Sequence, residues 1–463
     1  MFKPRPKQQE VLEYTSGKMG VAAVPGSGKT ATLSYLAAQL VAHTDLEDGQ
    51  EILIVTLVNS AVSNFARQIN QYIKHSGLLP GFGYRVRTLH GLANDIVRQK
   101  PTVAQLDENF TIVDEREAND ILKDAVEVWM KTHPFAPNAY LSRDYVNQPG
   151  YRNQRWGGAV LNIAQVFIRQ AKDDLLSPSM IQKMLDAYKG DLPLVVMCNA
   201  IYRDYERGLS YRGAVDFQDL IRLALYVLRQ DEQYCRSLQR KWVYILEDEA
   251  QDSSKLQEDI LRLLVGENGN WVRVGDPNQA IFETFTTANP AYLRNFIHAD
   301  DVIARELPNS GRSTRSIQKL ANYLIEWSLN HPNNDVRAKT PLTKPFIQPT
   351  PEGDPQPNPP DNPDRVFFLS NAQTPNQEAM IVINSAGKFT AEYPDQTVAI
   401  LVPRNERGSH IVTMLREQNI PYVENLRSTS STREVVKALK QILDYLAHPT
   451  DSARLADVYA VWM

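Results

Sequence analysis

The sequence predicts an α/β protein with a parallel sheet, a helical insertion within it and part of a second α/β region after it. Short β-branched runs alternate with helical patterns in two separated stretches of the chain. Apolar runs flanked by helices are typical of a parallel sheet that is covered on both faces. Between the two stretches, residues 103–213 have helical periodicity and no convincing strand. The 463 residues are enough for about three domains.

The two stretches together contain four expected strands, and a Gly-rich turn follows the first of them. Strand Gly20–Val24 precedes the turn, and an apolar-periodic helix from Thr30 to Val41 follows it. The other buried strands are expected at Glu51–Val58, Trp242–Leu246 and Trp271–Val274. These segments predict one domain, formed by residues 1–102 and 214–300.

The insertion is expected to fold as a helical domain over residues 103–213. Its helical periodicity is clearest in Glu115–Lys131 and Ser179–Tyr205. Apolar positions three and four residues apart give a helix one face to bury, which is the period seen in both segments. An all-helical domain inserted between strands of one sheet is the simplest organisation that fits.

The second α/β region is expected over residues 301–463. Its strand candidates are Val302–Leu307, Val366–Leu369 and Val398–Val402. Residues 341–363 contain nine of the chain's 28 prolines. Proline removes a backbone donor, so this stretch cannot be a regular helix or a central strand. We expect a loop or an exposed excursion there, and a plain linker is the favoured interpretation.

Composition and charge exclude several classes of protein. The formal net charge of -4 gives no general affinity for nucleic acid, so any such site must be a local patch. No apolar run reaches the length of a membrane span, and the N-terminus lacks the apolar stretch of a secretory signal. Two cysteines, Cys198 and Cys235, are too few for a disulfide framework or a zinc cluster. We therefore expect a cytoplasmic protein with no membrane partner.

A phosphate-binding loop is predicted at residues 23–30, which read AVPGSGKT between an expected strand and an expected helix. Glycines let the backbone curl so that its N–H groups and the helix N-terminus cradle phosphate oxygens. Lys29 is placed to reach the β- and γ-phosphates, and the Thr30 hydroxyl to ligate Mg²⁺. Ala23 replaces the first glycine of the general pattern, and an ordinary Gly-rich turn is the alternative. The predicted binding residues are Pro25, Gly26, Ser27, Gly28, Lys29 and Thr30.

An acidic partner for this loop follows the expected strand at 242–246. Residues 246–252 read LEDEAQD. Asp248, at the strand end, is suited to holding Mg²⁺ together with Thr30, and Glu249 is suited to polarising an attacking water. A solvated acidic turn is the alternative interpretation. Coupled to the loop at Lys29, the pair predicts phosphoryl transfer to water.

The order and wording of the motifs resemble the UvrD/Rep-type superfamily 1A DNA helicases. Residues 6–10 (PKQQE) resemble the family's Q motif, in which the glutamine reads the adenine edge; Gln8 is the candidate and Gln9 the register alternative. Residues 56–61 (TLVNSA) and 88–92 (TLHGL) resemble two motifs that contact single-stranded DNA in the family. The resemblance therefore implies DNA contacts by Thr56, Asn59, Thr88 and His90.

Motifs II, III and IV of the family have counterparts at 248–252 (DEAQD), 274–282 (VGDPNQAIF) and 307–313 (LPNSGRS). The resemblance implies that Gln279 senses the γ-phosphate and that Phe282 and Phe285 stack on bases. Ordinary core packing is the alternative for the two phenylalanines. It also implies that Arg312 is an arginine finger, and a surface arginine that caps a helix is the alternative there. Residues 216–220 (DFQDL) and 399–422 resemble, respectively, the element that returns from the insertion and the opening of the second motor domain.

The resemblance implies a RecA-like P-loop NTPase domain (1A), a helical insertion (1B) and part of a second RecA-like domain (2A). It implies an ATP hydrolase that uses ATP and Mg²⁺ and unwinds DNA, moving in the 3′ to 5′ direction. The implied partner is single-stranded DNA, or DNA with a junction between single and double strands. It identifies no protein partner.

The sequence departs from the family pattern at several positions. Ala31 and Gly311 stand where the family has an arginine and a tyrosine that sandwich the adenine. Residues 286–288 (TTA) stand where Arg-Gly-Ala is usual. Patterns for motifs V and VI, which complete the second motor domain, do not occur in the sequence. We therefore expect the N-terminal portion of a helicase, with weak gripping of the base.

Two other classes of function fit part of this pattern. A nucleotide- and DNA-binding fragment without turnover would follow from the missing motif VI and from Ala31 and Gly311. A P-loop kinase or another NTPase would share the loop at Lys29. The GDPNQ of residues 275–279, followed by Arg312, argues against that second class.

Overall fold

The computed structural model describes residues 2–77, 79–136, 149–280, 288–339, 342–369 and 374–424, with a few residues beyond. The chain divides into two compact units, Met1–Val366 and Phe367–Met463, and each is treated by itself. None of the described helices is both long and apolar enough to span a lipid bilayer.

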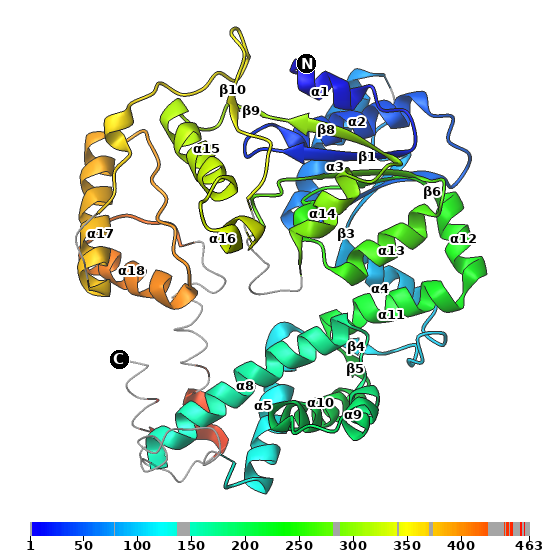
Figure 1. Cartoon of the computed structure of the whole chain (residues 1–463), viewed down its shortest axis with the longest axis vertical. Helices are drawn as coiled ribbons and strands as arrows, with labels where there is room; N and C mark the ends of the chain where they lie inside the picture. Colours follow the sequence, from blue (N-terminus) through cyan, green and yellow to red (C-terminus); the bar gives the residue numbers. More distant parts are fainter. Residues whose placement is uncertain are drawn as a thin grey trace. The chain divides into compact units, whose positions relative to one another are not determined.

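A six-stranded sheet forms the centre of the first unit (Figure 1). In spatial order its strands are β3 (Tyr84–Thr88), β2 (Glu51–Thr56), β6 (Trp242–Glu247), β7 (Asn270–Gly275), β1 (Lys18–Ala23) and β8 (Val302–Leu307). All neighbouring pairs are parallel, which confirms the predicted fold class. Because carboxyl ends of parallel strands meet at one edge, the loops that follow these strands can build one site there.

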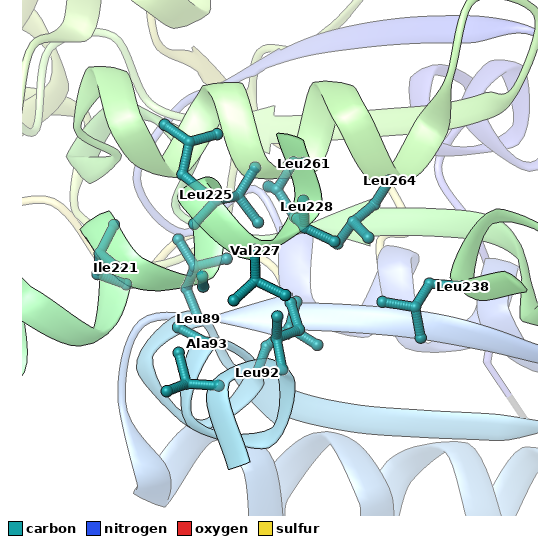
Figure 2. Close-up of a cluster of buried hydrophobic side chains, with 14 of the residues drawn as sticks. Leu89, Leu92, Ala93, Ile221, Leu225, Val227, Leu228, Leu238, Leu261 and Leu264 are labelled. Carbon is teal, nitrogen blue, oxygen red and sulfur yellow. The ribbon is translucent and has the colours of Figure 1, made fainter. Parts of the chain in front are cut away.

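Both faces of the sheet are covered by helices, as the continuous apolar strands predict. Ile52 and Ile54 of β2 pack under one set of helices, and Leu53 and Val55 under the other. The first set is α1 (Pro6–Leu12), α2 (Lys29–His43) and α3 (Asn59–His75). The second set is α4 (Leu89–Gln99), α11 (Phe217–Gln230), α12 (Glu232–Lys241), α13 (Lys255–Val265) and α14 (Pro290–Ile297). Figure 2 shows leucines of α4, α11, α12 and α13 gathered in the second cluster.

Two strands differ from the sequence-based expectation. β3 is not predicted, because Arg85 and Arg87 alternate with Val86, the one residue of this strand that is fully buried. β8 was expected to open the second α/β region, but it pairs with β1 in the first sheet. An unpaired β1 would leave a row of backbone groups exposed at a sheet edge, and β8 covers it. The assignment of domains 1A, 1B and 2A stays a prediction.

The insertion contains four described helices, α5 (Glu115–Thr132), α8 (Pro149–Asp173), α9 (Pro178–Ala187) and α10 (Pro193–Tyr211). They share one apolar cluster that includes Trp129, Trp156 and Tyr202. The expected helix at 179–205 is split in two, since Pro193 starts α10 and lacks the N–H that a continuous helix would need. A two-residue parallel pair, β4 (Thr111–Ile112) with β5 (Ala214–Val215), holds the entry and exit of the insertion together, where no strand was expected.

A buried lysine ties the insertion to the sheet domain. Lys172 of α8 has no exposed side-chain surface, and its Nζ lies 2.7 Å from Asp216 Oδ2, 2.9 Å from Asp219 Oδ2 and 3.0 Å from Glu206 Oε1. Asp216 is also the N-cap of α11, where its side chain accepts from the Asp219 N–H. The DFQDL segment at 216–220 thus anchors the return of the chain. We call Lys172, Glu206, Asp216 and Asp219 the joint.

The Pro-rich segment is docked on the first unit, so its interpretation as a plain linker is wrong. Between β8 and this segment lie β9 (Asn309–Ser310), α15 (Arg315–Leu329) and α16 (Asn334–Lys339), and a short 3₁₀ turn at Pro363–Arg365 follows the segment. β10 (Gln348–Pro349) pairs in parallel with β9. Prolines exclude helix and central strand from the segment, but its Asn and Asp side chains and the remaining N–H groups still bond to neighbouring backbone.

The second unit has two described helices that pack together, α17 (Pro375–Glu392) and α18 (Asn405–Glu417). The strands expected at Val366–Leu369 and Val398–Val402 are not formed. Phe368 is 81% exposed and Leu401 is 92% exposed. A strand needs a hydrogen-bonded neighbour, and the described residues offer these two segments none.

Candidate nucleotide site and cleft

The phosphate loop runs from the end of β1 into α2, as predicted. Gly26 and Gly28 have φ values of +74° and +80°, and Gly28 caps α2 in the left-handed conformation. Only glycine takes these angles without strain, so the residue types dictate the curl. Lys29 and Thr30 are the first two residues of α2 and stand at its positive end, where an anion is favoured.

Lys29 forms an ion pair with Glu249, the residue after Asp248 in the loop that follows β6. The two side chains are 14% and 33% exposed, so the pair faces a partly dry space. Glu249 has a φ of +55°, unusual for a residue with a side chain. The strain places its carboxylate beside the phosphate loop, and strained non-glycine residues are concentrated at functional sites.

Asp248 is buried at the end of β6, and its Oδ1 has no hydrogen-bond partner among the described residues. Burial, and then the charge of Glu249, raise the pKa of Asp248 to about 7. An unpaired buried carboxylate costs free energy unless a cation or donor meets it. This position is therefore suited to a cation brought by a ligand.

Two more acids near Lys29 share this character. Burial, followed by the charge of Glu249, raises the pKa of Asp252 to about 6, and burial raises that of Asp276 to about 6. Within the described part of the chain, Asp252 Oδ1 and Asp276 Oδ2 also have no hydrogen-bond partner. We call Asp248, Asp252 and Asp276 the site acids.

Gln251 connects the loops after β6 and β7, a role that the sequence analysis did not assign. Its Nε2 donates to Glu249 Oε2 at 2.8 Å and to Asp252 Oδ2 at 3.3 Å, and its Oε1 accepts from the Asp276 N–H at 3.1 Å. The side chain is buried. Its place in the DEAQD motif was the available signal, but only the fold shows which groups it joins.

The site fits Mg²⁺ held together with a polyphosphate. Among the described residues no group of three or more His, Cys, Asp or Glu forms a metal cluster. Mg²⁺ keeps several waters and is commonly bound by one or two protein oxygens plus substrate phosphates. The unpaired Asp248 oxygen, and Thr30 at the start of α2, supply the protein oxygens that such a site needs.

Gln8 lies against the phosphate loop. It is buried, its Nε2 donates to the Ser27 carbonyl at 3.0 Å, and its Oε1 accepts from the Arg5 N–H at 2.8 Å. A Cβ on Gly28 would come within 2.8 Å of Gln8 Nε2. Gln9, the register alternative, is not part of these contacts.

Arg312 and Gln279 also approach the loop and the site acids. A Cβ on Gly26 would lie 2.5 Å from Arg312 Cβ and 3.4 Å from its Nε, so the arginine lies on the phosphate loop. The Gln279 N–H donates to the Asp276 carbonyl at 3.0 Å. The structure thus brings Lys29, Asp248, Glu249, Gln279 and Arg312 to the phosphate loop or to the loops after β6 and β7.

The residues expected to contact DNA lie at the carboxyl ends of β2 and β3. Thr56 and Thr88 are register partners at those ends, and Asn59 starts α3. Asn59, Thr88 and His90 line a cleft of about 730 Å³ that extends to Arg169 of α8. Thr56 is buried beside it. Phe282 and Phe285 lie outside the described residues.

The cleft is more acidic than a phosphate-tracking groove. Among the described residues of its lining, Arg169 is the one Lys or Arg, against five acids, which are Asp114, Glu115, Asp173, Asp216 and Asp252. The aromatic groups of the cleft are better suited to contacts with bases than its charged groups are to contacts with phosphates. The rings of His90 and Phe217 meet edge to face at 6.0 Å, and burial lowers the pKa of His90, which favours the neutral ring.

A parallel sheet with a phosphate loop after β1 and acids after β6 defines a P-loop NTPase, here with helices inserted between β4 and β5. Residues 5–300 match the UvrD/REP helicase N-terminal domain family. The chain belongs to this family.

Curated relatives agree with this assignment. The chain is 24% identical over 459 residues to a protein of Staphylococcus aureus named ATP-dependent DNA helicase PcrA. It is 23% identical over 460 residues to the protein of the same name in Staphylococcus epidermidis. Each comparison covers 98% of this chain and 55% of the relative, so the chain spans about half the length of these relatives.

Proposed function

We propose that the chain is the N-terminal motor portion of an ATP-dependent DNA helicase that hydrolyses ATP with Mg²⁺ to unwind DNA. In this proposal residues 1–102 and 214–300 form domain 1A, residues 103–213 form 1B, and residues from 301 begin 2A. Its place of action is the cytoplasm. The observation that carries the proposal is the ion pair of Lys29 with Glu249 beside the buried Asp248, whose Oδ1 has no hydrogen-bond partner among the described residues.

Each of these three side chains has a role in phosphoryl transfer to water. When a triphosphate occupies the loop, Lys29 exchanges Glu249 for β- and γ-phosphate oxygens. Glu249 is then free to accept a proton from the attacking water. The strained backbone of Glu249 keeps its carboxylate in place during this exchange.

Asp248 and Thr30 would hold Mg²⁺, which supplies charge neutralisation for the phosphates when it is bound. The cation would also offset the cost of the buried Asp248 carboxylate, since a nearby positive charge favours the ionised form of an acid. ATP and Mg²⁺ binding should therefore each strengthen the other.

Three further residues complete the proposed reaction site. Arg312, which lies on Gly26, would stabilise charge on the γ-phosphate. Gln279 would sense the γ-phosphate from the loop after β7. Gln251 is a positioning residue, because it orients Glu249 and reaches Asp252, which also lines the cleft. This contact gives the cleft and the nucleotide site a shared element.

The proposed DNA site is the cleft with Asn59, Thr88 and His90, with Thr56 supporting it from β2. Single-stranded DNA would be gripped there through its bases, since stacking on aromatic rings contributes about 1–3 kcal/mol per base without reading sequence. Movement 3′ to 5′ and action at a junction of single and double strands belong to the same proposal.

The test is steady-state ATP hydrolysis by this chain, with and without single-stranded DNA. We expect hydrolysis stimulated by DNA, lost in Glu249→Gln with nucleotide binding retained. Lys29→Ala should abolish nucleotide binding. Calorimetry that finds unchanged ATP affinity in Lys29→Ala would refute the site assignment.

DNA binding has its own test in a filter-binding titration over a range of salt concentrations. Phosphate contacts release counterions, so affinity should fall as salt rises. Because the described lining of the cleft has a single arginine, we expect contacts outside this lining to supply most of the dependence. An affinity independent of salt would contradict a groove that follows the DNA backbone.

A second candidate function is binding of nucleotide and DNA without turnover. Ala31 and Gly311 favour it, because neither can stack on a base. In the hydrolysis assay this candidate predicts bound nucleotide and no phosphate release with or without DNA.

A further inference from the structure

Residues 348–358 form a strap that is fastened to the segment after β8. The Gln348 N–H donates to the Pro308 carbonyl at 2.8 Å. Asn358 Nδ2 donates to the carbonyls of Ser310 and Ser313 at 2.6 and 2.9 Å. Asn358 Oδ1 in turn accepts from the Thr350 N–H at 2.9 Å, which closes the strap on itself.

Arg5 joins the strap to the phosphate loop. Its guanidinium makes a two-pronged ion pair with Asp354, with Nε at 2.7 Å from Oδ2 and Nη2 at 3.2 Å from Oδ1. The two side chains are 8% and 3% exposed. The third prong, Nη1, donates to the carbonyls of Asn309 at 3.0 Å and Ser27 at 3.4 Å. A planar guanidinium matches this arrangement, and a lysine could not reproduce it.

Gly311 leaves the room that the strap occupies. A Cβ at this position would lie 2.2 Å from the Gln356 carbonyl oxygen and 3.2 Å from both Arg5 Nη2 and Thr350 Cγ2. Backbone cannot yield to such a contact as a flexible side chain can. Any larger residue at 311 would therefore displace the strap, and the backbone of Gln356 lies where that side chain would start.

We propose that the strap is the base-side wall of the nucleotide site and contributes to binding of the base of a nucleoside triphosphate. The proposal rests on the proposed function and adds the part of the site that holds the base. Asp354 and Arg5 are positioning residues: they fix the strap and touch no phosphate.

The position of Gln8 argues for the base side. Gln8 and Arg5 donate to the same Ser27 carbonyl, at the side of the loop where the α1 residues lie. The contacts of Gln8 with Ser27 and Arg5 use one of its two N–H groups and one of the two lone pairs of Oε1. A side-chain amide pairs with an adenine through one donor and one acceptor, so Gln8 retains the groups that it needs.

The strap also explains how the site could hold a base although Ala31 and Gly311 stand at the two positions expected to stack on it. Neither residue offers a flat surface for a base, whereas the strap brings the backbone of Gln356 to the place where a side chain at 311 would start. The triphosphate would be held by the backbone N–H groups of the loop and by Lys29, whereas the link from the strap through Arg5 ends on the Ser27 carbonyl. Loosening the strap should therefore weaken binding of the base and spare binding of the phosphates.

The experiment compares Asp354→Asn with Asp361→Asn in the full chain. Asp361 belongs to the same Pro-rich segment, but it is exposed and accepts from Ser316, so it is a matched control. Calorimetry measures affinity for ATP and for inorganic triphosphate, each with Mg²⁺. We expect Asp354→Asn to weaken ATP binding about tenfold, as the loss of a charged hydrogen bond can do, and to leave triphosphate binding unchanged.

Gly311→Ala tests the same wall by a steric route. Its added Cβ meets the Gln356 carbonyl, so it should reproduce the selective loss of ATP affinity. Unchanged ATP affinity in both variants, tighter ATP binding, or equal losses for ATP and triphosphate would each overturn the proposal. Failure of the proposed function looks different, because there Lys29→Ala would leave both ligands bound as before.

Discussion

The site acids and two acids of the joint, Asp216 and Asp219, are wholly or partly buried carboxylates on the same sheet domain, yet their surroundings are opposite. Asp248, Asp252 and Asp276 have oxygens without partners among the described residues, and burial raises their pKa values. At the joint, burial also works to raise the pKa of Asp216, but Lys172 outweighs it and holds the pKa low. The fold completes one set of charges and leaves the other for a ligand.

This difference separates structural charge from functional charge. A buried ion pair that is complete can hold two parts of a chain in one arrangement, and removing one partner is costly. A buried acid without a partner destabilises the protein until something binds, and such groups are concentrated at functional sites. Burial alone does not distinguish the two sets, whereas the partners of each oxygen do.

The largest effect should come from Lys172→Met. It leaves Asp216, Asp219 and Glu206 without their shared cation, so the free energy of unfolding should fall by about 3–5 kcal/mol. Chemical denaturation measures this loss. A fall below 1 kcal/mol would mean that the joint is not a structural tie.

Asp248→Asn should act in the opposite direction. Replacing a buried carboxylate whose Oδ1 has no hydrogen-bond partner among the described residues by a neutral amide should raise the free energy of unfolding at pH 8 by about 1–3 kcal/mol without nucleotide. The same variant should lose Mg²⁺-dependent nucleotide binding. A loss of stability in this variant would erase the contrast with the joint.

The pH dependence of stability sharpens the comparison. The pKa of Asp248 is raised from 3.8 to about 7, so between these values the folded protein holds the proton that the unfolded chain has lost. The free energy of unfolding should therefore fall as pH rises through this window. The pKa of Asp216 is lowered, so its contribution is present at neutral pH and is lost as pH falls below about 4.

Denaturation curves from about pH 2 to about pH 8 test both signs, because the loss from Asp216 falls below about pH 4 and the decline from Asp248 above it. Asp248→Asn should flatten the decline toward neutral pH, and Asp216→Asn should remove the loss on the acid side. If the two variants shift the same part of the curve, the assignment of opposite roles is wrong.

The smallest effect is expected at an exposed pair. Glu232 and Arg236 lie one helical turn apart on α12, with side chains 78% and 66% exposed. Glu232→Gln should change the free energy of unfolding by less than about 0.5 kcal/mol. It serves as the control for the other carboxylate-to-amide variants, and a larger change would show that charge number alone matters.

The sequence predicts those parts of the fold that local pattern determines. Strand–loop–helix order around Lys29 and the acids after β6 follow from residue type and spacing, because backbone curl and charge at those points need few long-range contacts. The parallel sheet follows from strands that are apolar on both faces. Asp248 and Glu249 are placed as this pattern implies.

The other parts of the fold could not be predicted, because they depend on contacts between residues far apart in the sequence. β8 has the same apolar pattern whether it opens a new sheet or closes the first one, and only pairing with β1 decides. The sequence predicts a linker at the strap because its prolines exclude regular structure. Its attachment to the rest of the unit depends on the pair of Asp354 with Arg5, which lies 349 residues away in the sequence. Gln251 is recognisable within its motif, but the groups that it joins come from two different loops.

The pairing of β4 with β5 has a consequence for the evolution of this chain. The insertion leaves at Ile112 and returns at Ala214, on adjacent strands. A part whose two ends meet can be lengthened, shortened or exchanged without stretching the scaffold that carries it. The helical insertion could therefore be replaced by another one during evolution. The replacement would need a cation equivalent to Lys172 to pair with Asp216 and Asp219.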